Sequence, residues 1–188
     1  VPQSDAAKAA IQTVMLLQRQ GQAGQAKAHA AQLLQQFPKC AASLYLNFQL
    51  ASTAQNYSTA GHYLTSALAI MPEQPVLLLS YAQLMLKQYC YGIAVEYANK
   101  AAACYQGNNI AFLFAAAGVM MQAEKPDSAA AVYQRMLNIE PANLKAMYQL
   151  ALCYFFLNKA DAAAELLNAV IAKDATNAGA VHLRSALK

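Results

Sequence analysis

Cysteine and histidine are the side chains best suited to bind a metal ion or to serve as a catalytic nucleophile and its base, and here they are widely separated. A zinc site normally shows such ligands a few residues apart, and a nucleophilic site needs a base close to its cysteine or serine. No cysteine belongs to a CxxC pair and no histidine has a partner in register. We therefore expect no metal, no cofactor and no enzymatic activity. The residues concerned are Cys40, Cys90, Cys104, Cys153, His29, His62 and His182.

The same cysteine spacing bears on the cellular compartment. We interpret the four cysteines as free thiols, which favours a reducing compartment and hence the cytoplasm. The chain begins with Val1 rather than with methionine, so we expect it to be processed or cut from something longer. A removed export signal, and with it a periplasmic location, is therefore the alternative.

Charge and composition exclude two further classes of site. The 13 Lys and Arg residues are scattered, although the formal net charge is +4, so we expect no nucleic-acid partner. Hydrophobic residues make up 58% of the chain and charged residues 12%, which predicts a large apolar interior. The longest apolar run, Ile110 to Met121, is shorter than the about 20 residues that a membrane-spanning helix needs. We expect no insertion into a membrane.

Prolines and alanines recur with a period of about 34 residues. Pro38 and Pro72 are 34 residues apart, and Pro141 follows 69 residues after Pro72, two periods and one additional residue. The additional residue fits the turn at residues 107–109. A fixed period of this length is typical of repeat arrays. The alanines in the same phase are Ala26, Ala60, Ala94, Ala129 and Ala163.

Each repeat is expected to contain two helices. In the last full repeat Met147, Leu150, Ala151 and Tyr154 have the spacing of one helix face, and a second apolar stripe follows the polar break at residues 158–159. Equivalent breaks occur at residues 20–22, 55–56, 88–90 and 124–125. Pro38, Pro72 and Pro141 each follow a second helix and stop it, whereas Gln106 and Ala175 replace proline in the other two repeats that should have it.

These features resemble the tetratricopeptide repeat. The resemblance rests on the phased alanines, on Ala82, Ala117 and Ala151 at the eighth place of their repeats, and on the turn at residues 139–143, and it covers about residues 7–177. It implies an all-α fold, a right-handed α-α superhelix in which each helical pair buries its apolar face against its neighbours. Asn47 and Phe48 depart from the family pattern, so we expect unusual packing in the second repeat.

On this phase the chain divides into an N-terminal tail, residues 1–6, and five repeats. The repeats are expected at residues 7–40, 41–74, 75–109, 110–143 and 144–177. Residues 178–188 are expected to form a C-terminal helix, either a cap or an unfinished repeat.

In this family, five places on each first helix face a concave groove that binds a polypeptide. None of those places holds Asp or Glu in this chain. Large apolar side chains can supply burial and glutamines can bond to a peptide backbone. Phe155 and Phe156 cannot share one narrow helix face, so one of them should meet a groove, a capping helix or a partner. We predict a protein or peptide partner that binds at Tyr45, Gln49, Leu79, Gln83, Phe114, Met121, Tyr148, Leu152, Phe155 and Phe156.

Two alternatives to a non-catalytic scaffold stay open. The Ala- and Gln-rich segments, such as residues 33–38, are similar to bacterial repeats that precede sulfotransferase-like domains, so the chain could be the repeat region of a larger enzyme. The phenylalanine pair and the apolar last helix could instead join two copies of the chain in a homodimer.

Overall fold

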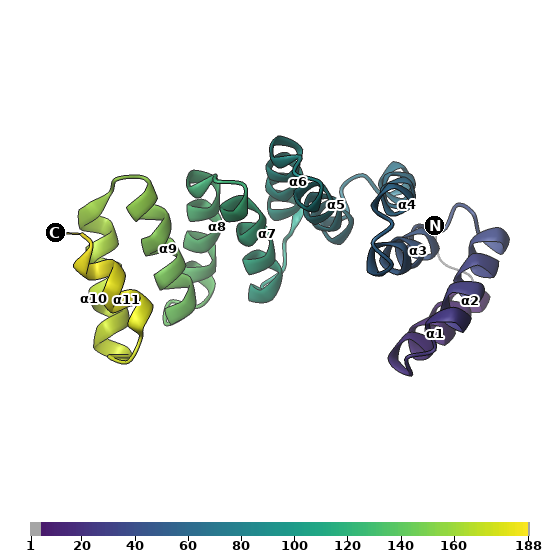
Figure 1. Ribbon diagram of the computed structural model, residues 1–188, viewed down its shortest axis with the longest axis horizontal. Coiled ribbons are helices and arrows are strands. Elements are labelled where there is room, and N and C mark those ends of the chain that lie inside the picture. Colours follow the sequence, from purple (N-terminus) through teal and green to yellow (C-terminus); the bar gives the residue numbers. More distant parts are fainter. Residues whose placement is uncertain (1–4, 188) are drawn as a thin grey trace. The chain divides into compact units, whose positions relative to one another are not determined.

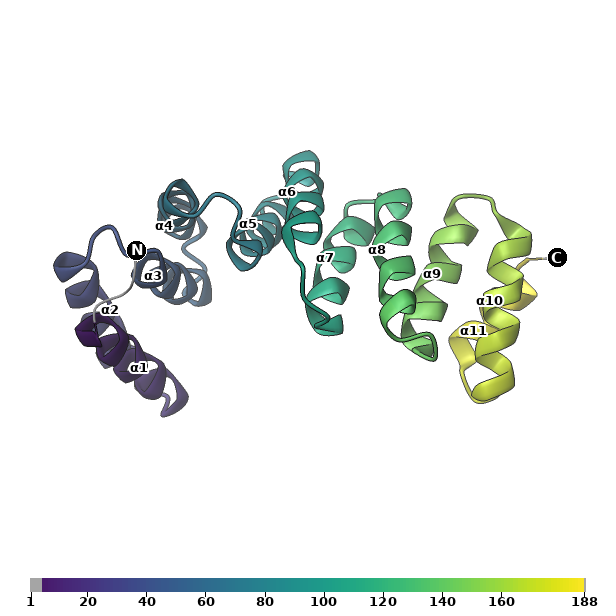
Figure 2. The same ribbon diagram turned by 180° about the vertical axis from the view of Figure 1, so that it is seen from behind.

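The computed structural model describes residues 5–187, and over this range the chain consists of helices and short connections without a strand (Figures 1 and 2). Ten helices form five consecutive pairs, and an eleventh follows the last pair. The predicted all-α class is confirmed. The helices are α1 (Asp5–Arg19), α2 (Ala23–Gln36), α3 (Ala41–Thr53), α4 (Tyr57–Ile70), α5 (Pro75–Lys87), α6 (Tyr91–Cys104), α7 (Ile110–Gln122), α8 (Pro126–Ile139), α9 (Leu144–Phe156), α10 (Ala160–Lys173) and α11 (Ala178–Ser185).

The chain divides into two compact units, residues 1–84 and residues 85–188, with the boundary inside α5. In the first unit α1 packs on α2, α2 on α3, and α3 on α4. In the second unit each helix from α6 to α11 packs on the next. Consecutive helices thus cover one another's apolar faces within each unit, as the repeat predicts. Of the predicted tail, residues 1–4 lie outside the described residues, whereas residues 5 and 6 belong to α1.

The alanines that share the repeat phase lie on the second helix of each pair. All five are completely buried, with 0% of their surface exposed. A methyl group is the largest side chain that lets two helix backbones approach closely. Because protein interiors are closely packed, a larger side chain would not fit at such a contact. The alanine spacing in the sequence therefore marks the closest helix contacts. The residues are Ala26, Ala60, Ala94, Ala129 and Ala163.

The turn inside each pair places one residue in the left-handed backbone region. Only glycine adopts this conformation without steric cost, and Asn tolerates it better than most residues. The five turns use glycine once and larger residues four times. These residues, which fall at the polar breaks of the sequence, are Gly21 (φ 74°), Gln55 (57°), Tyr89 (60°), Glu124 (57°) and Asn158 (56°).

Gly21→Ala is expected to lower the free energy of unfolding by about 1 kcal/mol, because an alanine is strained at positive φ. Gly24→Ala, in the first turn of α2, is expected to raise it by about 0.5 kcal/mol, because alanine is the better helix former. A Cβ added at either glycine meets no atom within 4 Å, so only the backbone conformation differs. Chemical denaturation followed by circular dichroism measures both changes. Equal losses at the two positions would contradict the explanation.

The residues that precede the first helices differ in how well they cap them. Asn109, Asn143 and Asn177 stand immediately before α7, α9 and α11, and each side-chain oxygen accepts hydrogen bonds from backbone N–H groups of the first turn. The Gln74 Oε1 accepts one N–H of α5 at 2.6 Å. Cys40 precedes α3 without a side-chain capping bond. Asparagine is among the best capping residues, so the described first helices of the second unit begin with stronger caps than α3 and α5 do.

Side chains from the connection itself and from the following pair hold the connection between α6 and α7, residues 105–109. The Tyr105 ring stacks on Phe112 with ring centroids 4.2 Å apart, and the Tyr105 hydroxyl accepts the N–H of Asn109 at 3.0 Å. The guanidinium of Arg135, on α8, donates to the carbonyl oxygen of Ala102 at 2.7 Å and to that of Tyr105. This connection is the one to which the sequence assigns the additional residue.

Asn47, which departs from the family pattern, is accommodated in the second pair by hydrogen bonds to the backbone. Its side chain is buried, with 7% exposed, and its amide donates to the carbonyl oxygens of Ala30 and Ser43, both at 3.0 Å. Ala30 lies on α2, so the amide ties α3 to the preceding pair. A buried polar group that is satisfied in this way does not destabilise the core.

Candidate functional site

All ten side chains predicted to bind a partner lie on the first helices of pairs. They are divided between the two units, four in the first and six in the second. Tyr45 and Gln49 belong to α3, and Leu79 and Gln83 to α5. Phe114 and Met121 belong to α7, and α9 carries Tyr148, Leu152, Phe155 and Phe156.

In the first unit, Tyr45 connects two successive first helices. Its hydroxyl lies 3.2 Å from the Ser80 Oγ of α5, and its ring is half-buried beside Phe48, with centroids 5.5 Å apart. Leu79 is buried, with 7% of its surface exposed, and so offers little area to a partner. Gln49 and Gln83, by contrast, are exposed. Among the predicted residues, this unit therefore offers one edge of the tyrosine and the two glutamines to a partner.

In the second unit, two contacts join α7 to α9. The Lys145 Nζ lies 4.9 Å from the centroid of the Phe114 ring, a cation–π contact, and the Phe114 ring meets Tyr133 edge-on at 5.6 Å. Deeper in the unit, the Cys153 thiol donates to the Met121 sulfur at 3.3 Å. Both Phe114 and Met121 stay half-buried. Both of these predicted residues of α7 therefore contact residues of α9.

The remaining four predicted residues lie where α9 meets α10 and α11. Tyr148, Leu152 and Phe155 pack against a cluster of buried residues from these three helices. Phe156 meets Phe155 edge-on at 5.8 Å and keeps 57% of its surface exposed. The two phenylalanines therefore separate as their adjacency requires, one toward the last helix and one toward solvent. The cluster consists of Ala151, Leu167, Val170, Ala180 and Leu183.

Burial changes the acidity of two groups in the second unit. Loss of solvation raises the pKa of the Cys153 thiol to about 11. The same cause, with a smaller contribution from Cys153, raises the pKa of the Tyr133 hydroxyl to about 12. Both groups stay protonated at neutral pH, so neither is an activated nucleophile.

These pKa values predict a loss of stability at alkaline pH. In the unfolded chain the Cys153 thiol releases its proton near its ordinary pKa of 9.0, whereas the folded chain retains it to about pH 11. Unfolding therefore releases protons in this window, and the free energy of unfolding should be undiminished below pH 9 and fall as the pH rises from 9 to 11. Tyr133 extends the fall to about pH 12. Guanidinium denaturation at pH 8, 9 and 10.5 measures this slope.

Cys153→Ala should flatten the slope between pH 9 and 11, because it removes the buried thiol. Cys90→Ala, which removes an exposed thiol, is the matched control and should leave the slope unchanged. A slope that is equally steep in both variants would show that Cys153 is not responsible.

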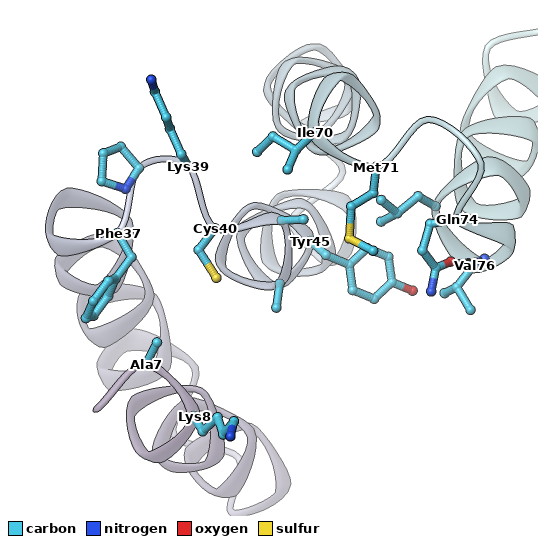
Figure 3. A pocket seen from close by; sticks show the side chains of 14 residues that line it. Ala7, Lys8, Phe37, Lys39, Cys40, Tyr45, Ile70, Met71, Gln74 and Val76 are labelled. Atoms are coloured by element: carbon cyan, nitrogen blue, oxygen red, sulfur yellow. Dashed lines mark hydrogen bonds between the residues drawn. The ribbon is translucent and has the colours of Figure 1, made fainter. Parts of the chain in front are cut away.

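The first unit also contains a cavity that the sequence analysis did not foresee, with a volume of about 1150 Å³. Its lining comes from the start of α1, from residues 37–40, from Ile70 at the end of α4, from Met71 and Gln74 in the connection that follows, and from the starts of α3 and α5 (Figure 3). Tyr45 is the predicted site residue that contributes to it. The sequence feature that could have indicated the cavity is the large apolar residue, Phe37 or Met71, that begins each of these two connections.

The described residues contain neither a metal-binding cluster nor a membrane-spanning helix. Among residues 5–187, no group of three or more His, Cys, Asp and Glu side chains is arranged to hold a metal ion. None of the helices in this range combines the length and the apolar character that crossing a membrane requires.

Comparison with known proteins gives a match to a repeat family over the C-terminal part of the chain. Residues 120–187 match the sequence model of the tetratricopeptide repeat family. No curated protein sequence matches the chain. The fold is similar to that of YrrB, described as a TPR protein with an unusual peptide-binding site, at 18% identity and a TM-score of 0.75, covering 94% of this chain and 90% of YrrB.

Two other solved structures share the fold. Pseudomonas aeruginosa pilF is 19% identical, with a TM-score of 0.71 over 97% of this chain and 83% of pilF. MamA from Desulfovibrio magneticus RS-1 is 15% identical, with a TM-score of 0.71 over 94% of this chain and 99% of that structure. At these identities the comparison establishes the fold.

Proposed function

Since the chain is built from tetratricopeptide repeats, a fold that typically mediates protein interactions, we propose that it is a non-catalytic scaffold that binds a protein or peptide partner. Within each unit the partner lies along the first helices, at the residues predicted from the sequence apart from Leu79, which is buried. YrrB, which has a similar fold, is described as having a peptide-binding site.

One observation carries this proposal. Within each unit, large side chains at the predicted places join successive first helices while keeping part of their own surface exposed. Tyr45 does so between α3 and α5, and Phe114 between α7 and α9. Contacts of this kind hold the side chains in fixed positions before a partner arrives, so less conformational entropy is lost on binding.

Photo-cross-linking tests the proposal directly. A benzoylphenylalanine at the position of Gln83 or Phe156, both exposed on first helices, should form a covalent adduct with the partner in a lysate of the source cells. The same group at the position of His62 on α4 or Gln134 on α8, both exposed on second helices, is the matched control. Adducts of equal yield from all four positions, or from none, would contradict binding along the first helices.

The comparisons give no support to a homodimer, so we propose a heterologous partner. Adducts of twice the chain mass would reveal self-association in the same experiment. The spacing of the four cysteines in the sequence favours free thiols, and the cytoplasm is the location that belongs to this proposal. The Ala- and Gln-rich composition of the repeats supports a bacterial origin.

A further inference from the structure

A glycine in the middle of α7 has no packing contact that requires its small size. Gly118 belongs to a helix of 13 residues, and glycine is, after proline, the poorest helix former. A Cβ added to it would meet no atom within 4 Å, so neither a neighbouring side chain nor a neighbouring helix excludes a larger residue. The space above Gly118 is therefore open.

The place that Gly118 occupies carries a long side chain on other first helices. The ninth residue is Gln49 on α3, Gln83 on α5 and Leu152 on α9. Gly118 is the ninth residue of α7. The surface of α7 therefore has a recess, about the size of one side chain, at a place where those three helices do not.

Two contacts between α7 and α9 bound this recess along the helix. Phe114, one turn before Gly118, has the Lys145 Nζ at 4.9 Å from its ring centroid. Met121, about one turn after Gly118, accepts a hydrogen bond from the Cys153 thiol at 3.3 Å. Residues three and four positions apart share a helix face, so Gly118 lies on the face that carries both contacts. With a rise of about 1.5 Å per residue, the recess between them is about 10 Å long.

The walls and the floor of the recess favour an apolar side chain. The walls are the ring of Phe114 and the thioether of Met121, and both residues keep part of their surface exposed. The floor is the backbone of α7, whose N–H and C=O groups are bonded within the helix. A polar group of a partner would lose its water there and gain no hydrogen bond. A large apolar side chain gains burial against all three surfaces.

The charge at the edge of the recess is positive. The Lys145 side chain is exposed and carries its ammonium over the Phe114 ring. The sequences of α7, α9 and α11 contain no Asp or Glu. Glu140, in the connection before α9, accepts a hydrogen bond from the Asn143 amide at 2.8 Å. A partner that covers the ammonium removes its water, and a carboxylate compensates for that loss with an ion pair, whereas an uncharged group does not.

We propose that the second unit binds a partner segment in which acidic residues flank one large apolar residue. The apolar side chain fills the recess over Gly118, and a carboxylate faces Lys145. This assignment rests on the proposed function, that the chain binds a polypeptide along its first helices, and adds the chemistry of the segment. It makes Gly118 and Lys145 the residues that determine specificity in this unit.

A nuclear magnetic resonance titration of the whole, nitrogen-15-labelled chain tests the assignment, because it detects weak binding and locates it. The probes are three acetylated and amidated peptides: EELEE, then EEAEE, which lacks the large side chain, and KKLKK, which has the opposite charge. EELEE should shift the backbone amide resonance of Gly118 in a saturable way. Its Kd should be at least about fivefold lower than the Kd of either other peptide, because each of them loses one of the two recognised features.

Gly118→Leu tests the recess, because it places a side chain of the protein where the side chain of the partner should lie. It should weaken EELEE binding at least about tenfold. Gly92→Leu, in the first turn of α6, is the matched control, since a Cβ there also meets no atom within 4 Å, and it should leave binding unchanged. Both variants replace glycine with a better helix former, so neither should lower the urea concentration at the midpoint of unfolding.

Lys145→Glu tests the charged part of the assignment. It should weaken EELEE binding at least about tenfold and make KKLKK the tighter ligand. Lys173→Glu makes the same change of charge at an exposed residue of a second helix, the last of α10, and should preserve the preference for EELEE. Circular dichroism confirms that both variants are folded.

Three results would overturn the assignment: no saturable shift at Gly118, equal affinity for EELEE and either other peptide, or EELEE binding that Gly118→Leu leaves unchanged or strengthens. A preference for EELEE that survives Lys145→Glu would overturn the role of the ammonium. Each of these leaves the proposed function intact if the partner still cross-links from positions 83 and 156. Failure of the cross-links would instead refute the proposed function.

Discussion

Arg135→Met is expected to lower the free energy of unfolding by about 3 kcal/mol, because charge-assisted hydrogen bonds contribute about 1.5–3 kcal/mol each and two carbonyl oxygens lose their donor. The guanidinium bonds the carbonyl oxygens of Ala102 and Tyr105, one at the end of α6 and one in the connection that follows. Methionine retains most of the apolar stem, so the loss measures the hydrogen bonds. Guanidinium denaturation, followed by circular dichroism, gives the value.

Arg184→Met is the matched control for this substitution. Its Nε donates to the Asn168 side chain at 2.9 Å, but this bond lies at the protein surface. Water replaces the partner there, so a loss below about 0.5 kcal/mol is expected. A loss at Arg135 as small as that at Arg184 would show that the connection between α6 and α7 does not depend on the guanidinium.

Ala129→Leu is expected to destabilise the second unit by about 3 kcal/mol, at the upper end of the cost of overpacking. Ala129 is one of the five phased alanines and has no exposed surface, so three additional carbons must displace a neighbouring helix. Ala131→Leu, on the same helix but exposed, should change the stability by less than about 0.5 kcal/mol. Urea denaturation measures the free energy of unfolding of both variants. Similar losses of this free energy would contradict the close helix contact at Ala129.

The sequence was sufficient to predict the helical pairs because their determinants are local and repeated. A buried alanine at the closest helix contact, a polar break before the second helix and a proline after it recur with the repeat, and each acts within its own pair. Small misfits, such as Gln106 at a place where other repeats have proline, do not change this pattern because the neighbouring pairs still bury the same faces.

The state of individual site residues could not be predicted, because it depends on neighbours in other pairs. Leu79 and Phe114 occupy the same place in their repeats, yet Leu79 is buried whereas Phe114 keeps part of its ring exposed beside Lys145. The departure at Asn47 was recognisable, but its bond to Ala30 was not, because the two residues belong to different pairs. The Arg135 bonds escaped prediction for the same reason.

The way in which successive first helices touch means that the repeats cannot be freely exchanged. The Phe114 ring is covered by Lys145, the second residue of α9, whereas the Tyr148 hydroxyl reaches Gly179, the second residue of α11. A Cβ at Gly179 would lie 2.9 Å from that hydroxyl oxygen. Copying the α9 sequence into α11 would therefore displace an aromatic ring in the repeat before it. Any shuffled or consensus array made from this chain has to carry these residues over in pairs, across the border between two repeats.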